Sequence, residues 1–403
     1  PTCSLFSCLL CSVNVRTRQS MRRVSAEKIK KLMPKFLLSA LLASGIAALT
    51  GSCSIWEQLG KGPSQQELSD FERSPHFNKE QQVFENRRPK ILEEMNERID
   101  WRLTLEYFTS DSSRRTPDKP LPEVNPPDLQ AFLEPTDSLR FIWLGHSTLL
   151  VNVQNKLVLF DPVFSNSAAP VNFLVQRFQP AVLSLEELPP IDYIVISHDH
   201  YDHLDMRSVQ FFRDKEATFL VPLGIKSHLE YWGVASKNIV ELDWWAEHEF
   251  EGIRFVCTPA QHFSGRTGTN QTTLWASWVV DSPNSKIYFS GDSGYDEHYQ
   301  KIGDQLGPFD AAFIDSGQYN ERWREVHNLP EEAVQAAIDL RAKQMIPIHW
   351  AMFELSLHDW DEPIKRSQQA AEELGMELMT PKLGQVVDLA VKNQFSHWWE
   401  QVQ

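Results

Sequence analysis

Short apolar segments alternate with turn residues along the chain from about residue 139 onward. Such segments are rich in Val, Ile, Phe and Tyr and are bounded by Gly, Pro, Asp or Ser, which is typical of β-strands. Eleven segments are predicted as strands: LRFIWLG (139–145), TLLVNV (148–153), KLVLFD (156–161), IDYIVIS (191–197), ATFLVP (217–222), IRFVCTP (253–259), TLWASWVV (273–280), KIYFSGD (286–292), DAAFIDS (310–316), QMIPIHW (344–350) and QVVDLAV (385–391).

Helices are predicted between some of the later strands. The segment LPEEAVQAAIDLRAKQ (329–344) has two acidic residues in its first turn, and DMRSVQFF (205–212) also has a helical start. The early strands follow one another closely, as in hairpins, whereas the later strands alternate with helices. We therefore predict an α/β fold with two sheets at its centre and helices outside them.

Residues 54–138 are predicted to form a polar N-terminal extension. Its segment 91–108 has a helix-like or mixed apolar pattern, and its segment 116–135 (TPDKPLPEVNPPDLQAFLEP) contains six prolines in twenty residues. Proline at this density disfavours helix and central strand. We expect segment 116–135 to be an extended connector on the surface.

The first 53 residues have the pattern of a targeting segment. Basic residues precede an apolar run at 36–50, which is too short for a typical membrane span but fits the core of a signal sequence. The run ends at LTGSC, which resembles a bacterial lipoprotein signal with Cys53 as the lipid acceptor. Met21 and Met33 are candidate starts. We predict an exported periplasmic or outer-membrane lipoprotein that associates with the membrane through Cys53. Secretion without lipid, a short anchor and a cytoplasmic location are the alternatives.

The net charge and the cysteine content exclude some kinds of partner and of metal site. The net charge of −15 argues against a nucleic-acid partner, which would require a basic surface stripe. Cys257 is the only cysteine after residue 53, so neither a disulfide framework nor a cysteine zinc cluster can organise the body of the chain. A metal there would be held by His, Asp or Glu.

The segment ISHDHYDHLD (196–205) concentrates three histidines and three aspartates at the end of a predicted strand. Residues two apart on extended chain point the same way, and a turn into a helix brings the following side chains to the same volume. Imidazole and carboxylate are the ligands that zinc accepts without thiolate. Four residues are predicted as ligands: His198, His200, Asp202 and His203. Asp205 is expected to be a helix-entry charge, and Asp199 to lie behind the ligands or face solvent.

Three further candidate ligands each follow a later apolar strand: His262, Asp292 and His349. Strands that end at one edge of a sheet deliver their following residues to one place. Seven ligands suit two zinc ions with one shared carboxylate.

The motifs identify a family resemblance. HDHYDH (198–203) matches the H-x-H-x-D-H signature of the metallo-β-lactamase fold superfamily, and GDSG (291–294) and IHW (348–350) resemble its later ligand strands. Over about residues 139–392 the chain is similar to the N-acylphosphatidylethanolamine-hydrolysing phospholipase D family and its bacterial relatives, through WLGHSTLLV, FDPVF, TPAQHFSGR, IGDQLGPFD and HNLPEEAV. The resemblance implies a four-layer αβ/βα sandwich over residues 139–395, with the metals at one edge.

The resemblance also implies roles for single residues. One zinc would be held by His198, His200 and His262. The other would be held by Asp202, His203 and His349, with Asp292 as the bridge. His327 matches a histidine at the mouth of the site that assists the substrate or leaving group, and His146 is expected behind the ligands. One segment departs from the family: IDSGQY (314–319) stands where lipid-hydrolysing members read a sequence like PIGAY.

These residues predict a zinc-dependent hydrolase with two Zn²⁺ per chain. Zinc lowers the pKa of a bound water from about 15.7 to about 7, which gives a hydroxide nucleophile. Asp202 would orient this nucleophile and His327 would protonate the leaving group. The predicted substrate is a small molecule or lipid, foremost an N-acylphosphatidylethanolamine-like phosphodiester. A lactonase or other small-molecule hydrolase, and an envelope lipoprotein with a structural metal site, are the alternatives. Three nearby aromatic residues are expected to be core rather than an acyl pocket: Trp350, Phe353 and Trp360.

Overall fold

The structure is a computed structural model that describes residues 55–99, 103, 106, 114–266 and 271–402. The chain divides into two compact units, Pro1–Gly60 and Lys61–Gln403, and the second contains both large sheets. The targeting segment predicted at residues 1–53 lies outside the described residues.

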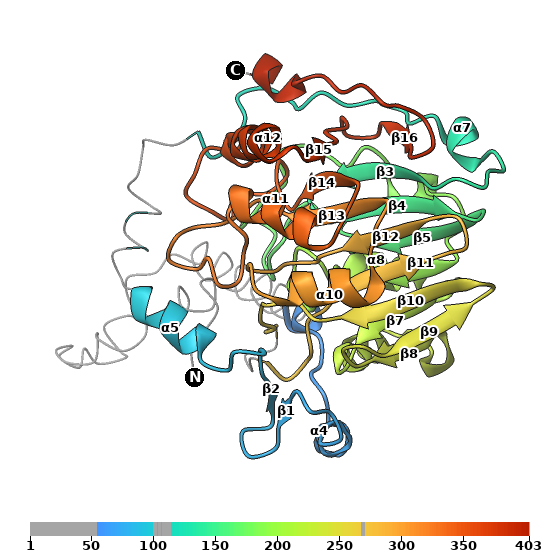
Figure 1. Cartoon of the computed structure of the whole chain (residues 1–403). Coiled ribbons are helices and arrows are strands. Elements are labelled where there is room, and N and C mark those ends of the chain that lie inside the picture. Colours follow the sequence, from blue (N-terminus) through green and yellow to red (C-terminus); the bar gives the residue numbers. More distant parts are fainter. Residues whose placement is uncertain (1–54, 100–102, 104–105, 107–113, 267–270, 403) are drawn as a thin grey trace, which may run out of the picture. The chain divides into compact units, whose positions relative to one another are not determined.

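Two seven-stranded sheets form the centre of the second unit (Figure 1). The first sheet has the order β16-β3-β4-β5-β6-β7-β8, with β3 Arg140–Gly145, β4 Thr148–Val153, β5 Lys156–Phe160, β6 Tyr193–Val195, β7 Thr218–Pro222, β8 Ile239–Leu242 and β16 Val386–Asp388. The second has the order β15-β14-β13-β12-β11-β10-β9, with β9 Glu247–Phe250, β10 Ile253–Thr258, β11 Ser277–Asp281, β12 Lys286–Phe289, β13 Ala311–Asp315, β14 Gln344–Ile348 and β15 Glu377–Leu378. All eleven predicted strands are present.

Each sheet changes from antiparallel to parallel partway across. β3, β4 and β5 pair as antiparallel hairpins, and β5 to β8 then run parallel. The second sheet repeats this plan, with antiparallel β9 to β12 followed by parallel β12 to β15. All parallel neighbours except β5 and β6 are joined through α-helices, which are α8 (Met206–Phe212), α9 (Ile225–Tyr231), α10 (His298–Leu306), α11 (Pro330–Asp339) and α12 (Glu362–Leu374). The change from hairpins to helix-connected strands therefore occurs twice, once in each sheet, whereas a single change along the chain was predicted.

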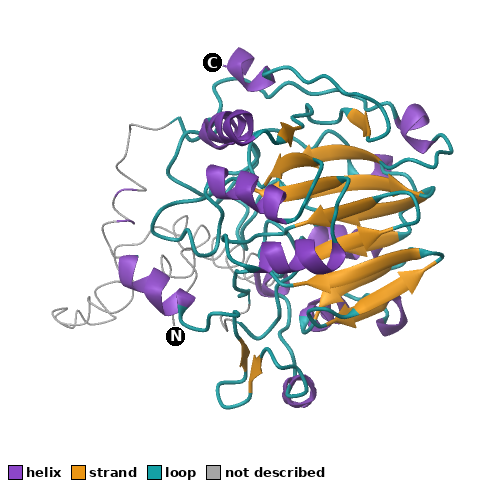
Figure 2. Cartoon of the chain, viewed as in Figure 1, coloured by secondary structure: helices purple, strands orange, loops and turns teal. Residues whose placement is uncertain are grey.

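Alternating side chains place the sheets face to face with helices outside (Figure 2). On β3, Phe141 and Trp143 join the core shared by both sheets, whereas Ile142 and Leu144 join a second core that includes residues of α8 and α9. A third core joins the second sheet to α10, α11 and α12. Period-two alternation with both faces buried gives the four-layer αβ/βα sandwich expected from the family resemblance.

The proline-rich segment is not wholly extended, contrary to expectation. Helix α7 (Leu129–Leu133) begins after the two prolines at 126–127, which precede the helix and so do not interrupt it. The Asp128 carboxylate accepts a hydrogen bond from the Ala131 amide and caps the helix. Phe132 is fully buried in the core beneath the first sheet, which holds the segment in place.

The extension before this segment adds three small elements to the same compact unit. They are helix α4 (Gln65–Phe71), the hairpin β1–β2 (Phe77–Asn78 and Val83–Phe84) and helix α5 (Ile91–Arg98). Helix α5 falls within the segment whose pattern is helix-like or mixed, and the hairpin was not predicted.

Candidate metal centre

The predicted ligands converge where strands of the two sheets end. His198, His200 and His203 follow β6 of the first sheet. The other ligands follow strands of the second sheet: His262 follows β10, Asp292 follows β12 and His349 follows β14. The carboxyl ends of parallel strands lie at one edge of a sheet. Because the two sheets stack, the side chains that follow these ends lie close together.

Three histidines form the first part of the centre, called here the His200 group: His198, His200 and His262. The Nδ1 atom of His200 lies 2.9 Å from His198 Nε2 and 3.1 Å from His262 Nε2. Asp292 Oδ2 lies 3.7 Å from both of these Nε2 atoms. One nitrogen of each ring therefore faces a common point, with a carboxylate on one side.

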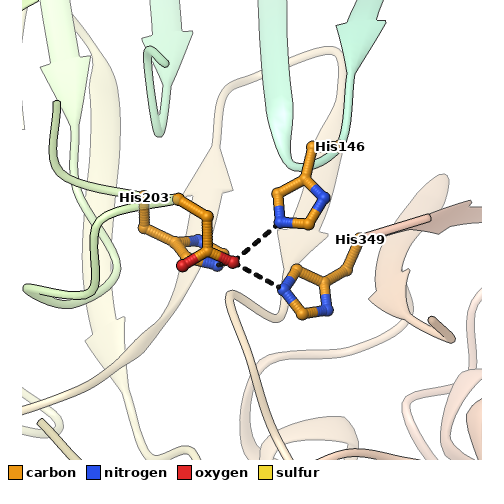
Figure 3. A group of neighbouring side chains, drawn as sticks. His146, His203 and His349 are labelled. Carbon is orange, nitrogen blue, oxygen red and sulfur yellow. Dashed lines mark hydrogen bonds and ion pairs between the residues drawn. The ribbon is translucent and has the colours of Figure 1, made fainter. Parts of the chain in front are cut away.

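The second part, called here the His203 group, consists of Asp202, His203 and His349. Asp202 Oδ2 lies 3.4 Å from His203 Nε2 and 3.2 Å from His349 Nε2. Asp292 reaches this group also, with Oδ1 3.1 Å from His203 Nε2 and Oδ2 3.2 Å from His349 Nε2. In Figure 3 the rings of His349 and His146 both turn toward one carboxylate oxygen, Asp202 Oδ2. Asp292 thus faces both groups, as the bridging prediction requires.

The donor atoms fit two divalent ions. Nitrogens that share one tetrahedral zinc at about 2.0–2.1 Å lie about 3.3–3.4 Å apart, close to the spacings in both groups. His203 Nε2 and Asp292 Oδ1 are buried, and although they lie 3.1 Å apart, neither forms a hydrogen bond of acceptable geometry within the described part of the chain. Buried polar atoms without partners are costly, and a bound cation would satisfy them.

In four of the histidine rings, Nδ1 points away from the centre and contacts another residue. His203 Nδ1 contacts Asp161 Oδ2 at 2.7 Å, and His349 Nδ1 contacts Asp315 Oδ1 at 3.2 Å. The remaining two contacts are His262 Nδ1 to the Val326 carbonyl at 2.9 Å and His198 Nδ1 to Ser197 Oγ at 2.9 Å. A partner on Nδ1 fixes the ring and leaves Nε2 toward the centre, which is typical of histidines that bind metal.

The histidines of the two groups differ in whether their surroundings favour the neutral or the protonated ring. Burial lowers the pKa of His198 and of His262 well below the ordinary imidazole value, which leaves these rings neutral. Burial also lowers the pKa of His349, but neighbouring carboxylates, Asp292 foremost, outweigh burial and raise it to about 10. The pKa of His203 is likewise raised well above its usual value, against the effect of burial, by Asp292 and other carboxylates. The carboxylates therefore favour a cation in the His203 group.

The sequence alone did not single out two carboxylates that support the centre, Asp161 and Asp315. Each stands at the end of a predicted strand, in FDP and IDS, which is the available signal. Asp199, predicted to lie behind the ligands or face solvent, is 2% exposed and accepts hydrogen bonds from the Gly265 amide and Thr273 Oγ1. Its carboxyl therefore does not face solvent. Asp205 is the N-cap of α8, in agreement with its predicted role.

Comparison with known proteins identifies the superfamily. A model described as "Beta-lactamase superfamily domain" matches residues 156–350. The chain is 36% identical over 251 residues to an N-acyl-phosphatidylethanolamine-hydrolyzing phospholipase D 1 of Caenorhabditis elegans, covering 58% of this chain and 70% of that protein. The chain belongs to the metallo-β-lactamase superfamily.

The chain is also similar to a bacterial protein and to a solved structure. The chain is 50% identical over 91 residues to Outer membrane protein RomA of Klebsiella pneumoniae, covering 23% of this chain and 69% of that protein. The structure of an isothiocyanate hydrolase from Delia radicum gut bacteria has a TM-score of 0.51 and 18% identity, and covers 62% of this chain and 98% of that chain. The latter likeness shows the shared fold. The protein is a metal-dependent hydrolase of the metallo-β-lactamase fold.

His146 and His327 flank the superfamily ligand set. His146 was expected behind the ligands, but its Nε2 lies 2.8 Å from Asp202 Oδ2 and faces the same oxygen as His349 Nε2, so His146 lies beside the His203 group and could hold a metal with it (Figure 3). His327 Nδ1 lies 2.9 Å from Asp315 Oδ2, and the ring is 5.1 Å from that of His349. The His327 side chain is 13% exposed, so it lies at the edge of the centre with limited access to solvent.

The aromatic residues after the last ligand are mainly core. Trp350 stacks between Trp143 at 5.6 Å and Trp398 at 5.3 Å. Phe353 and Trp360 are also buried, but they line a small cavity of about 10 Å³ with residues such as Gln318. A cavity of this volume holds about one water molecule, so these contacts support the core-packing prediction.

The charge difference between the groups predicts proton release on metal binding. At pH 7 the His203 group holds protons that an ion must displace, whereas the His200 group is already neutral. Zinc uptake should therefore release roughly one to two protons, and affinity at the His203 group should rise from pH 7 toward pH 10. Calorimetric titration in two buffers of different ionisation enthalpy measures the release. Uptake of both ions without proton release would contradict the charge assignment.

Proposed function

We propose that this hydrolase cleaves phosphodiesters at a two-zinc centre, with a phospholipase D type of reaction on N-acylphosphatidylethanolamine-like lipids. The observation that carries the proposal is the convergence of both ligand groups on Asp292 in a chain that resembles the worm phospholipase over 70% of that protein's length. Two metals that share a carboxylate suit in-line displacement at phosphorus.

The chain's own residues have distinct roles in this reaction. Bound zinc ions would act as Lewis acids toward a phosphoryl oxygen and make a water molecule acidic enough to ionise near pH 7. Asp202 would orient that water, since its carboxylate already faces the centre. His327 Nδ1 lies 2.9 Å from Asp315 Oδ2. With the ring doubly protonated, Nδ1–H would donate to Asp315 and Nε2–H would give its proton to the leaving alkoxide.

A substrate comparison tests the proposal. The purified zinc-loaded full chain should hydrolyse bis-p-nitrophenyl phosphate and should release phosphatidic acid and an N-acylethanolamine from N-acylphosphatidylethanolamine. His327→Gln should lower kcat about 10²–10⁴-fold on the lipid, as expected for loss of a general acid. The effect should be smaller on the nitrophenyl ester, whose leaving group needs no proton. Efficient turnover of lactones with no activity on either phosphodiester would favour the lactonase alternative.

We also propose that the protein is exported and lipidated at Cys53. The signal-like pattern of residues 36–53 supports this, as does the similarity to a Klebsiella protein named as an outer membrane protein. Within the part of the chain that is described, no helix has the length and apolar character needed to cross a bilayer.

Substitution of the proposed lipid acceptor should change the protein's location. Full-length wild-type protein in a Gram-negative host should fractionate with membranes, because multiple acyl chains anchor stably. Cys53→Ser should release the protein to the soluble fraction or block maturation, whereas Cys257→Ala, at a buried cysteine, should stay membrane-bound. Wild-type protein that fractionates with cytosol and keeps residues 33–53 would contradict export.

A further inference from the structure

The buried side chain of Asn86 connects the N-terminal extension to the metal centre. It stands two residues after β2 and is 4% exposed. Its Nδ2 donates to the His262 carbonyl at 2.7 Å, and its Oδ1 accepts from the His262 amide at 3.1 Å. One carboxamide therefore binds both main-chain groups of a predicted ligand that is 176 residues away in sequence.

The orientation of the Asn86 carboxamide is itself fixed. Its Oδ1 also accepts a hydrogen bond from Trp275 Nε1 at 3.2 Å, and that indole donates to the Ala260 carbonyl at 3.1 Å. The neighbouring Phe84 amide donates to the Gln271 carbonyl at 2.7 Å. Satisfied buried polar networks of this kind hold one geometry, because breaking any member leaves a buried group unpaired.

The extension also supports the other side of His262. Met95 of α5 belongs to a buried cluster with Trp323 and Val326, and the Val326 carbonyl is the partner of His262 Nδ1. Arg98 of the same helix forms an ion pair with Glu325. The backbone of His262 is thus held through Asn86, and the acceptor for its ring lies in a segment packed against α5.

We infer that Asn86 is a positioning residue for metal binding, acting through His262, and that the extension is part of the metal centre. The inference rests on the metal site of the proposed function. His262 Nε2 must lie within about 2.1 Å of an ion, and a ligand whose backbone shifts by a fraction of an ångström loses that geometry. The consequence is confined to the His200 group, because Asn86 binds no residue of the His203 group within the described structure.

Metal titration of a matched pair of variants tests this. Asn86→Ala in the full chain should lower the affinity for one of the two zinc ions about 10–100-fold and leave the affinity for the other unchanged. The Co²⁺ absorption spectrum of one site should change with it. Competition with a chromophoric chelator measures both affinities. Asn152→Ala is the control, because Asn152 is also buried and also donates to a distant carbonyl, that of Phe132. It should lower stability without changing either zinc affinity.

Asn86→Asp provides a second variant of nearly the same shape. It keeps an acceptor for the His262 amide, but it replaces the Nδ2 donor with an oxygen that faces the His262 carbonyl. The affinity for the same zinc ion should therefore fall. Wild-type affinity at both sites in either Asn86 variant would overturn the inference while leaving the proposed function intact. A wild-type chain that takes up no Zn²⁺ or Co²⁺ would instead contradict the proposed function, and this inference with it.

Discussion

Asp292→Ala is expected to abolish turnover and to reduce the metal content from two ions per chain to one or none. The side chain faces both ligand groups, with Oδ1 3.1 Å from His203 Nε2 and Oδ2 3.2 Å from His349 Nε2. Without it, two like-charged ions would lose the anion between them. Loss of one group that stabilises transition-state charge costs on the order of 10²–10³ in kcat, so the decrease should be at least this large.

Elemental analysis and kinetics on a phosphodiester that the wild type hydrolyses measure these effects. Asp281→Ala is the matched control, because Asp281 also lies at the end of a strand but binds Arg254 and Lys286 instead of a predicted ligand. The control should keep two ions and full turnover. An Asp292→Ala protein with near-normal activity would show that Asp292 has been assigned the wrong role.

Chelation is expected to inactivate the protein and to destabilise the whole sandwich. An ion present at 1,000 times its dissociation constant stabilises the folded state by about 4 kcal/mol, so two such ions contribute about 8 kcal/mol. The melting temperature should fall by on the order of 10 °C or more.

Calorimetry before and after dialysis against a chelator measures the shift, and readdition of zinc should restore both stability and activity. Asp292→Ala offers an internal comparison, since its melting temperature should respond less to chelator than that of the wild type. A wild-type protein whose melting temperature and activity are unchanged by exhaustive chelation would be incompatible with a two-ion centre.

The sequence predicted elements that carry strong local patterns. After its first residue the buried strand β5 is a continuous apolar run, and HDHYDH concentrates its ligands within six residues. Strand β9 was missed because its sequence, EHEF, is polar and its burial is partial. Such an edge strand lacks the alternation by which a half-buried strand is recognised.

The supporting residues of the metal centre could not be predicted in the same way. Asp161 and Asp315 become recognisable only when β5 and β13 bring them behind His203 and His349. Asn86 has no local signal at all, because its role depends on contacts across the fold. Helix α7 was not expected for a different reason: proline density disfavours helix over the whole segment, but prolines that precede a short helix do not interrupt it.

The distribution of the ligands along the chain has a consequence for the timing of metal loading. The ligands of the His200 group are spread from residue 198 to residue 262, and the His203 group is complete only with His349. The supporting Asn86 lies far upstream of both groups. Neither site exists until both sheets have formed and docked, which requires most of the chain to have left the ribosome. Closing such long loops in an unfolded chain is entropically costly, so ions bind tightly only to the finished fold. A chain that crossed a membrane unfolded would therefore cross without its zinc and acquire it on the far side.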